Sequence, residues 1–517
     1  MAAGIHHITL ITRKVQANVD FYAGFLGLRL VKRTAGFEDA MQLHLFYGDA
    51  AATPGSLVTF LVWEDGSPGR LGHGQTGELS FAIDPASIGY WLTRALSFGI
   101  KAEGPMDEFG EPTLRLKDPD GVIVKLCGAG GMRPVAFWEA GGVPEEHAIG
   151  RIRGATVFTE VPELTEAFLQ EHFGYRRSAE SGSIRRLGST SGDIVDVRDA
   201  TGFWSSAPGT GTFDHIAFRA RDREDLARVH AGLNALNSSV TNVHDRKYFD
   251  SLYVREPGGA LIELATDQPG MTVDEPLETL GSALFVPETS EIPADDVPIV
   301  LPQFSMPGEE RVIYRDLPFV HRFFTPDDAD GSTLILLHGS GGSEASLMPL
   351  ARRASPQSTL LGVRGRSTEE GIARWFRRFE GLAFDQDDIR SEAEAFAAFL
   401  EGAIAAYRLD RNRITLAGHS NGANFLAAFL LLHPALVGRA VLLRPMPVLV
   451  DPPDWDLSAV CVLAIAGRDD PFAEHAPPLV ALLEARGAEA SLRDIDAGHD
   501  IAAADAALIR AWLGEEP

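Results

Sequence analysis

The chain has 517 residues, of which 45% are hydrophobic and 23% are charged, and its formal net charge is −26 at pH 7. This length is too great for one ordinary hydrophobic core and predicts two or three domains. The negative charge excludes nucleic acid and anionic membrane as expected partners, because both would repel the chain. The expected partners are therefore small molecules.

The sequence also bears on location and redox state. It begins MAAGIHHITL, without a basic segment followed by an apolar core, and no apolar run approaches the roughly 18 residues that a membrane helix needs. The two cysteines, Cys127 and Cys461, lie far apart and make no disulfide framework. We therefore expect a cytoplasmic protein with two buried free thiols. The oligomeric state stays open, with a homo-oligomer as one option.

Four stretches of the first three hundred residues share one order of elements. Each has a short strand, a helix, and further strands closed by a turn and a last strand. The strands alternate apolar and polar residues, as half-buried strands do. The helices end at or near glycine or asparagine, a common helix stop, and are predicted over residues 15–27, 86–99, 161–174 and 222–236.

Local motifs connect these four modules to a known family. Residues 18–22 read NVDFY, residues 25–28 read FLGL, and residues 263–281 read ELATDQPGMTVDEPLETLG. Together they resemble the vicinal oxygen chelate (glyoxalase) superfamily, and within it the ring-cleaving dioxygenases that act on hydroquinones. The resemblance implies an α+β fold of βαβββ modules paired into open barrels. Modules one and two are placed in residues 1–140, and modules three and four in residues 148–285.

Two histidines and one glutamate are candidates for a metal site. Aligning the first strands of the modules places His7 of module one with His215 of module four. Glu263 lies in the last strand of module four. Two imidazoles and one carboxylate leave positions open on a metal, which is the arrangement of non-heme Fe(II) oxygenases. We therefore predict Fe(II), with Mn(II) also tolerated, and O₂ as a co-substrate beside a phenolic substrate.

The other modules lack these ligands. The position of His7 holds Ser80 in module two and Gly154 in module three, and the position of Glu263 holds Lys125 in module two and Thr59 in module one. A metal isomerase of the glyoxalase type would need a fourth donor, such as an acid at position 59. A threonine cannot supply it. The sequence therefore favours an oxygenase over this alternative.

Outer residues of the site follow from strand alternation and from the resemblance. Thr9 lies on the face of His7 by alternation, and His6 is expected on the opposite face, although the resemblance places an active-site histidine at position 6. The resemblance also implies proton transfer by Tyr253 and substrate anchoring by Arg246, roles that suit a phenol and a guanidinium. From its residues alone, Tyr253 reads equally well as a strand aromatic. Asp214 stands where the family often has another histidine, so its role stays open.

The module pattern ends near residue 285. Residues 286–310 hold several prolines and acidic residues with little periodicity, which predicts a linker. Apolar strands then alternate with helices, beginning with STLILLHGSGGSE at residues 332–344. This alternation predicts a mainly parallel, doubly wound α/β sheet in residues 311–517.

A serine, an aspartate and a histidine in this last part follow the order of an α/β-hydrolase triad. Ser420 stands in GHSNG between a predicted strand and a predicted helix, the setting of a nucleophile elbow. Gly418 and Gly422 allow close packing around a strained serine. Asp470 and His499 each follow a later strand. We predict that His499 acts as the base on Ser420 and that Asp470 orients it.

Neighbouring residues complete this second candidate site. Asp469 competes for the acid role, but Asp470 is favoured because it lies three residues after a glycine and directly before a proline. The backbone N–H groups of Ser340 and Asn421 are predicted to form the oxyanion hole. The segment resembles the phospholipase/carboxylesterase family of α/β-hydrolases, and residues 363–389 resemble a branch found beside hydroquinone dioxygenases. This segment contains four further candidates, Trp375, Phe376, Arg377 and Arg378. They could line an acyl pocket or bind a carboxylate product, or they could form an exposed basic helix face.

Both candidate sites on one chain predict a bifunctional enzyme. One part would cleave a hydroquinone or catechol-type ring with O₂, and the other would hydrolyse an ester or activated acyl compound. Two alternatives remain for the first part: a glyoxalase-like metal isomerase, or an aromatic-binding module that serves the hydrolase.

Overall fold

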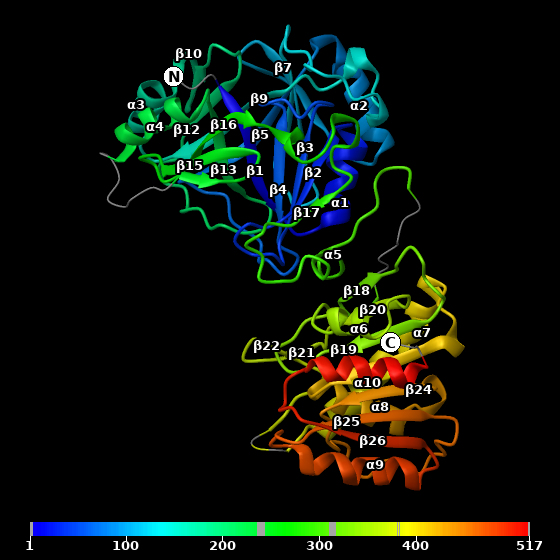
Figure 1. Cartoon of the computed structure of the whole chain (residues 1–517). Coiled ribbons are helices and arrows are strands. Elements are labelled where there is room, and N and C mark those ends of the chain that lie inside the picture. Colours follow the sequence, from blue (N-terminus) through cyan, green and yellow to red (C-terminus); the bar gives the residue numbers. More distant parts are fainter. Residues whose placement is uncertain (1–3, 235–242, 310–316, 380, 382, 515–517) are drawn as a thin grey trace. The chain divides into compact units, whose positions relative to one another are not determined.

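A computed structural model describes residues 4–234, 243–309, 317–379, 381 and 383–514. These residues form two compact units, residues 1–297 with 304–310 and residues 298–303 with 311–517, and the boundary passes through the short helix α5 (Val297–Val300) (Figure 1). The domain boundaries expected from the sequence stay predictions. Within the described ranges, no helix has both the length and the apolar character needed to cross a membrane.

The first unit consists of four βαβββ modules, as predicted. Module one contains β1 (Ile5–Thr12), α1 (Val15–Val19), β2 (Arg29–Ala35), β3 (Leu43–Gly48) and β4 (Leu57–Val62). Module two contains β5 (Gln75–Ile83), α2 (Ile88–Ser97), β6 (Glu103–Glu108), β7 (Glu111–Lys117) and β8 (Ile123–Gly128). Module three contains β9 (Ile152–Thr159), α3 (Pro162–Phe173), β10 (Arg176–Ser181), β11 (Ile184–Gly188) and β12 (Ile194–Asp199). Module four contains β13 (Phe213–Ala220), α4 (Arg223–Asn234), β14 (Val243–Asp245), β15 (Phe249–Arg255) and β16 (Leu261–Pro269).

The predicted helices are present with altered ends. The helix expected over residues 15–27 is α1 followed by a π-helical turn over Asp20–Phe25. Helix α3 ends at Gly174, whose φ of +72° is a left-handed C-cap that suits glycine. The last two residues of the helix expected over 222–236 lie outside the described residues.

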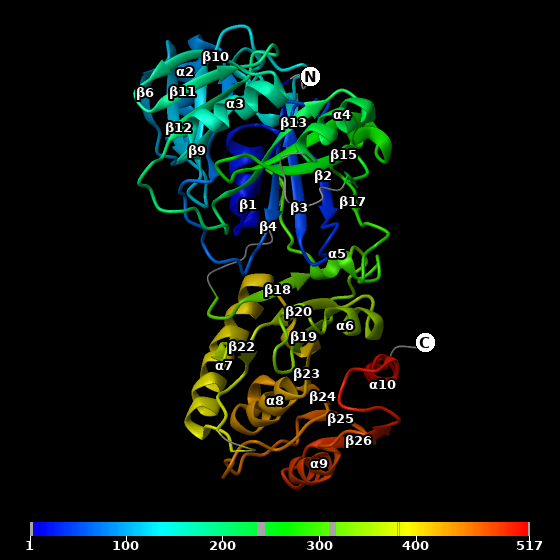
Figure 2. The same ribbon diagram turned by 90° about the vertical axis from the view of Figure 1, so that its left-hand side faces the viewer.

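Strand pairing joins module one to module four and module two to module three. The nine-stranded sheet has the order β14-β15-β16-β13-β1-β4-β3-β2-β17, where β17 is Leu284–Phe285. The eight-stranded sheet has the order β10-β11-β12-β9-β5-β8-β7-β6. In each sheet the first strands of two modules meet antiparallel, β1 with β13 (Figure 2) and β5 with β9 (Figure 1). Residues of modules one and four therefore share one sheet face.

The register of the two sheets corrects one alignment made from the sequence. In the first sheet, Thr9 pairs with both His215 and Thr59. In the second, Ser80 pairs with both Gly154 and Lys125. Ser80 therefore corresponds to Thr9, and the residue two positions earlier, Glu78, occupies the place of His7. The alignment on Ser80 was wrong because a shift of two residues keeps every strand side chain on the same face.

Internal cations balance the carboxylates at the equivalent places of the second sheet. Lys125 Nζ lies 2.8 Å from Glu78 Oε2, and the side chain of Lys125 is only 3% exposed. Asp196 pairs with Thr156 as Glu263 pairs with Ala217. It binds the guanidinium of Arg186 through both oxygens, at 2.9 and 2.8 Å. These ion pairs fill the places that the candidate ligands hold in the first sheet.

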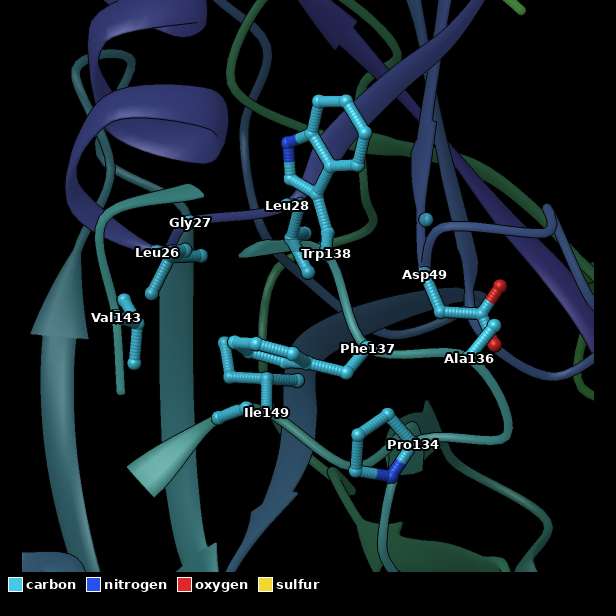
Figure 3. Close-up of a pocket in the computed structure, with 12 residues that line it drawn as sticks. Leu26, Gly27, Leu28, Asp49, Pro134, Ala136, Phe137, Trp138, Val143 and Ile149 are labelled. Atoms are coloured by element: carbon cyan, nitrogen blue, oxygen red, sulfur yellow. The ribbon is translucent and has the colours of Figure 1, made fainter. Parts of the chain in front are cut away.

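A small pocket lies where the connector between modules two and three crosses module one. It is lined by Leu26–Leu28, Asp49 and residues of the 134–149 connector, including Phe137 and Trp138 (Figure 3). The lining is mainly apolar. Its one carboxylate, Asp49, accepts hydrogen bonds from the backbone N–H groups of Ala51 and Thr53 at 3.2 and 2.9 Å. None of the predicted site residues lines this pocket.

The second unit is a doubly wound α/β sheet, as predicted. The seven strands have the order β18-β20-β19-β23-β24-β25-β26, and all pairs are parallel except β18 with β20. The strands are β18 (His321–Phe324), β19 (Thr333–Leu337), β20 (Thr359–Val363), β23 (Ile414–His419), β24 (Arg439–Leu443), β25 (Cys461–Gly467) and β26 (Glu489–Ile495). A short hairpin follows β20, formed by β21 (Ser367–Glu369) and β22 (Ile372–Arg374).

Helices cover both faces of this sheet and create two apolar cores. One core contains α7 (Gln386–Tyr407), α8 (Asn421–Leu432) and α9 (Ala476–Ala485), and the other contains α6 (Met348–Ala354) and α10 (Ala503–Leu513). The strands between them are apolar on both sides, which is typical of a parallel sheet. This arrangement brings the loops that carry Ser420, Asp470 and His499 to the carboxyl ends of β23, β25 and β26.

Candidate metal centre and candidate hydrolase site

The three predicted ligands meet in the middle of the nine-stranded sheet. Strands β1, β13 and β16 are neighbours there, and both His7 and Glu263 pair with Ala217. His7 Nε2 lies 3.2 Å from His215 Nε2 and 3.2 Å from Glu263 Oε2. His215 Nε2 lies 2.6 Å from the same oxygen. The structure thus brings together residues that are 208 positions apart in the sequence.

Two of these side chains are held from behind by hydrogen bonds. His215 Nδ1 lies 2.7 Å from Asp214 Oδ2, and the Ser251 hydroxyl donates to Glu263 Oε1. Such outer contacts decide which nitrogen and which oxygen face the centre. Asp214, whose role the sequence left open, therefore orients a candidate ligand.

The donor set fits a divalent metal ion. The ligand atoms of His7, His215 and Glu263 all lie within 4.8 Å of one another, and all three side chains are buried. Two imidazole nitrogens face the buried Glu263 Oε2, at 3.2 and 2.6 Å. A buried carboxylate is costly unless a positive charge, from a metal ion or from a protonated imidazole, balances it. Two imidazoles and one carboxylate are the ligands of non-heme Fe(II) oxygenases.

The charges of the three groups are complementary. Burial alone would raise the pKa of Glu263, but the two imidazoles hold it well below its usual range. Burial lowers the pKa of His7, and the negative charge of Glu263 offsets only part of this. Burial also opposes charging of His215, but Glu263 and Asp214 raise its pKa to about 9. Glu263 is thus ionised at neutral pH, as a metal ligand must be.

Three of the outer residues predicted for this centre surround it. Thr9 Oγ1 lies 2.9 Å from His215 Nε2. Tyr253 pairs with Glu263 in the strand register, and its ring meets that of His215 edge-on at 5.4 Å. The Arg246 guanidinium lies 5.7 Å from the centre of the Tyr253 ring. The phenol and the guanidinium thus stand together beside the candidate ligands.

His6 is a case where strand alternation made a wrong prediction. A β-bulge interrupts the pairing of β1 between Ile5 and His7, so His6 does not point to the opposite face as in a regular strand. Its Nδ1 lies 2.9 Å from His7 Nδ1, and the side chain is buried. His6 therefore lies beside His7, and its part in an active site stays a prediction.

His44 is a residue of this centre that the sequence did not reveal. Its Nε2 lies 2.9 Å from Thr59 Oγ1, which lies 2.9 Å from Thr9 Oγ1. Burial lowers the pKa of His44 to about 3, so the imidazole is neutral. Alternation in β3 shows that His44 and Phe46 share a face, but it does not say which face meets the site. Thr59, at the place of a fourth ligand, contributes only its hydroxyl to this chain of contacts.

The second candidate site is a hydrogen-bonded series of serine, histidine and aspartate. His499 Nε2 lies 2.8 Å from Ser420 Oγ, and His499 Nδ1 lies 3.0 Å from Asp470 Oδ2. A base beside a hydroxyl and oriented by a buried carboxylate is the geometry of a serine nucleophile. All three residues of the predicted triad are therefore in contact as the sequence order suggested.

Ser420 occupies a strained turn between β23 and α8. Its φ is +51°, a region that residues other than glycine rarely adopt. The flanking glycines make the turn feasible, because a Cβ on Gly422 would lie 2.2 Å from the Leu337 carbonyl oxygen and one on Gly418 would lie 2.6 Å from Gly422. This is the strand–turn–helix setting of a nucleophile elbow.

The turns around Ser420 are supported from the core. Asn421 is the first residue of α8, where backbone N–H groups have no intrahelical acceptor. The backbone N–H of Trp375 donates to Asn421 Oδ1 at 2.8 Å. The indole N–H of Trp375 donates to the carbonyl of His338 at 3.0 Å, and His338 lies two residues before Ser340. Trp375 and Phe376 are 0% and 1% exposed. Trp375 supports these turns, and both aromatic side chains lie in the apolar core and not on an exposed surface.

The two adjacent aspartates after β25 differ in a way that can be tested. Asp470 is buried and contacts His499, whereas Asp469 is exposed. We expect Asp470→Asn to lower kcat for ester hydrolysis by about 10⁴-fold, because His499 loses the carboxylate that orients it. Asp469→Asn is the matched control and should keep wild-type kcat. The assignment of the acid is wrong if the two variants exchange these results.

Comparison with known proteins places the two parts of the chain separately. The Glyoxalase/Bleomycin resistance protein/Dioxygenase superfamily profile matches residues 4–126. The "Putative ring-cleaving dioxygenase MhqO" of Bacillus subtilis is 37% identical over 286 residues, which are 55% of this chain and 91% of that protein. The "Chlorohydroquinone/hydroquinone 1,2-dioxygenase" of Sphingobium indicum is 31% identical over 297 residues, 55% of this chain and 91% of that protein.

A different relative matches the remaining part. The "Putative hydrolase MhqD" of Bacillus subtilis is 33% identical over 186 residues, which are 36% of this chain and 93% of that protein. The resemblances inferred from the sequence motifs are thus confirmed at the level of the family. The chain belongs to the ring-cleaving dioxygenases of the glyoxalase superfamily through its first unit, and to the family of the hydrolase MhqD through its second.

Proposed function

We propose that the protein is a bifunctional enzyme that cleaves a hydroquinone or catechol-type ring with O₂ and hydrolyses an ester or activated acyl compound through Ser420. The observation that carries the first activity is the convergence of His7, His215 and Glu263, with only a hydroxyl at position 59. Three protein ligands would hold Fe(II), or Mn(II), and leave positions open for substrate and O₂. The relative named as a hydroquinone dioxygenase supports this substrate class.

The residues around the ligands suit a phenolic substrate. Such a metal would bring O₂ and the phenolate together. Burial raises the pKa of Tyr253, and the nearby negative charge of Glu263 raises it further. The hydroxyl therefore stays protonated and can donate to an oxygen of the substrate. Burial lowers the pKa of Arg246, but Tyr253 and Glu38 outweigh this and raise it, so the guanidinium stays charged and can anchor a phenolate.

In the second unit, the triad would perform acyl transfer. His499 accepts the Ser420 hydroxyl proton as the oxygen attacks the carbonyl carbon, and Asp470 stabilises the resulting imidazolium. The backbone N–H groups of Ser340 and Asn421 would bind the oxyanion. His499 then gives this proton to the leaving alcohol as the ester C–O bond breaks, and an acyl-enzyme remains on Ser420. A water, with His499 again as the base, attacks the acyl carbon, and the bond to Ser420 Oγ breaks to release the acid while the serine regains its proton.

The chemistry of ring cleavage connects the two activities. When O₂ is inserted between a carbon that carries a hydroxyl and a neighbour that carries an alkoxy group, the first carbon becomes a carboxylic acid and the second an ester. Hydrolysis of that ester by one water releases the alcohol and a dicarboxylic acid. An alkoxy-substituted hydroquinone would therefore supply both units of this chain in turn.

Oxygen consumption by protein loaded anaerobically with Fe(II) tests the proposal. We expect uptake with hydroquinone and methoxyhydroquinone that stops on chelation, and release of methanol only from the second. Activity that needs a thiol cofactor but no O₂ would favour the isomerase alternative. Binding of aromatics by protein that takes up no metal would favour the binding module.

Metal loading should also stabilise the first unit, independently of activity. Because the folded donors bind the ion and the unfolded chain binds it weakly, we expect a gain of about 2.7 kcal/mol when the free metal concentration is about 100 times the dissociation constant. Calorimetry with and without Mn(II) measures this as a rise in Tm. The Glu263→Gln variant should show no such rise. Equal rises in both proteins would place the bound metal elsewhere.

A further inference from the structure

Side chains of neighbouring elements hold the loop that carries His499 through hydrogen bonds to its backbone carbonyl groups. Arg444 Nε donates to the Gly498 carbonyl at 3.0 Å, and Arg444 Nη2 donates to the Asp500 carbonyl at 3.0 Å. Between them, His419 Nε2 donates to the His499 carbonyl at 2.9 Å. Three successive carbonyls of a loop between β26 and α10 are thus bound by two side chains, the buried Arg444 and the half-buried His419. The His499 imidazole remains directed at Ser420 and Asp470.

Arg444 is itself firmly anchored. Its guanidinium and the Asp505 carboxylate are both 0% exposed. They form a bidentate pair, with Nη1 and Nη2 at 2.8 and 2.9 Å from the two carboxylate oxygens. Asp505 Oδ2 also accepts from the backbone N–H of Ala502 at 2.7 Å, at the beginning of α10. The arginine therefore joins the end of β24 to the beginning of α10, with the His499 loop between them.

The backbone of the residue before Arg444 also holds Ser420. The carbonyl of Leu443 accepts a hydrogen bond from the Ser420 backbone N–H at 2.9 Å. The next residue, Arg444, has a φ of +54° and donates its own N–H to Ile465 at 2.8 Å. Residues kept in this sparsely populated region cluster at functional sites. Two consecutive residues thus hold the backbone of Ser420 and the loop of His499.

We propose that Arg444 is a positioning residue of the hydrolase, which sets the distance between His499 and Ser420 by clamping the carbonyls on either side of His499. This inference rests on the proposed hydrolase function. Arginine suits the task because its planar fork presents five N–H donors, enough for two carbonyls and one carboxylate together. A lysine ammonium would keep the charge but not this arrangement of donors.

Two variants separate positioning from folding. Arg444→Lys keeps a cation opposite Asp505, and the double variant Arg444→Met/Asp505→Leu removes both buried charges at once, which is often tolerated. We expect both to lose about 100-fold in kcat for a simple ester such as p-nitrophenyl acetate, because a displacement of about 1 Å has this effect. KM should stay unchanged. A fluorophosphonate that labels Ser420 counts the active sites, and its labelling rate should fall in parallel with kcat.

Leu483→Ala in α9 is the control for simple destabilisation. This fully buried leucine lies in the apolar core that contains α7, α8 and α9, and no hydrogen bond of the triad involves it, so each labelled site should keep wild-type kcat. Wild-type kcat per labelled site in Arg444→Lys would overturn the positioning role. If the double variant does not fold, the result for Arg444→Lys is sufficient to test this role. A wild-type protein that neither labels nor hydrolyses esters would overturn the hydrolase proposal and this inference with it.

Discussion

Replacing Glu263 with glutamine should abolish oxygen uptake with hydroquinones and leave ester hydrolysis intact. The carboxylate is fully buried, faces two imidazoles, and is the only anionic donor of the candidate metal centre among the described residues. An amide would remove the charge that balances a divalent ion. Because changes to outer-shell residues alone cost about 10–100-fold in metal affinity or activity, we expect a loss of at least about 100-fold in uptake rate. An oxygen electrode and metal analysis of the purified protein measure the effect.

Asp196→Asn is the matched control for this experiment. Asp196 stands at the register position of Glu263 in the eight-stranded sheet, but its partner is Arg186. Its replacement removes a buried charge of the same kind without touching the candidate ligands. Oxygen uptake per folded protein should remain at the wild-type level. If Glu263→Gln keeps both metal and uptake, the metal assignment is wrong.

Replacing Ser420 with alanine should have the opposite effect on the two activities. Loss of the nucleophile removes the attacking oxygen that His499 activates at 2.8 Å. We expect ester hydrolysis to fall by about 10⁴- to 10⁶-fold, as in other serine hydrolases, with oxygen uptake unchanged. With methoxyhydroquinone, this variant should accumulate a methyl ester and release no methanol, which mass spectrometry can follow.

The exposed Ser458 provides the control, since Ser458→Ala should leave both activities unchanged. Oxygen uptake by Ser420→Ala that yields an aldehyde and no ester would show that the ring opens at another bond. In that case the hydrolase would act on a different acyl compound, while its triad would still be testable with simple esters.

Most of the secondary structure could be predicted because it depends on local patterns. The apolar alternation of β1, β5, β9 and β13 and the glycine-terminated helices occur within short windows. The triad could be predicted for the same reason, since each member stands in a short motif in the loop after a strand. The place of His44 could not be predicted, because the sequence does not say which face of β3 is directed toward the candidate metal centre.

His6 and Trp375 show where local patterns fail. A β-bulge turns His6 toward His7, and bulges leave no clear signal in the residues themselves. Trp375 reads as a substrate-contacting aromatic in its segment, yet it stacks on Phe425 with a ring distance of 5.0 Å inside the core. Burial of an aromatic is decided by the helices that pack around it.

The sequence by itself determined the repeated modules, the candidate ligand types and the order of the triad, because periodicity and short motifs are local properties. Only the tertiary structure decided that module one pairs with module four, that Glu78 takes the place of His7 in the second sheet, and that Arg444 holds the His499 loop. Each of these depends on strand register or on contacts between distant segments. Register shifts by two residues preserve the alternation of faces, so the choice among them is made by packing of the whole unit.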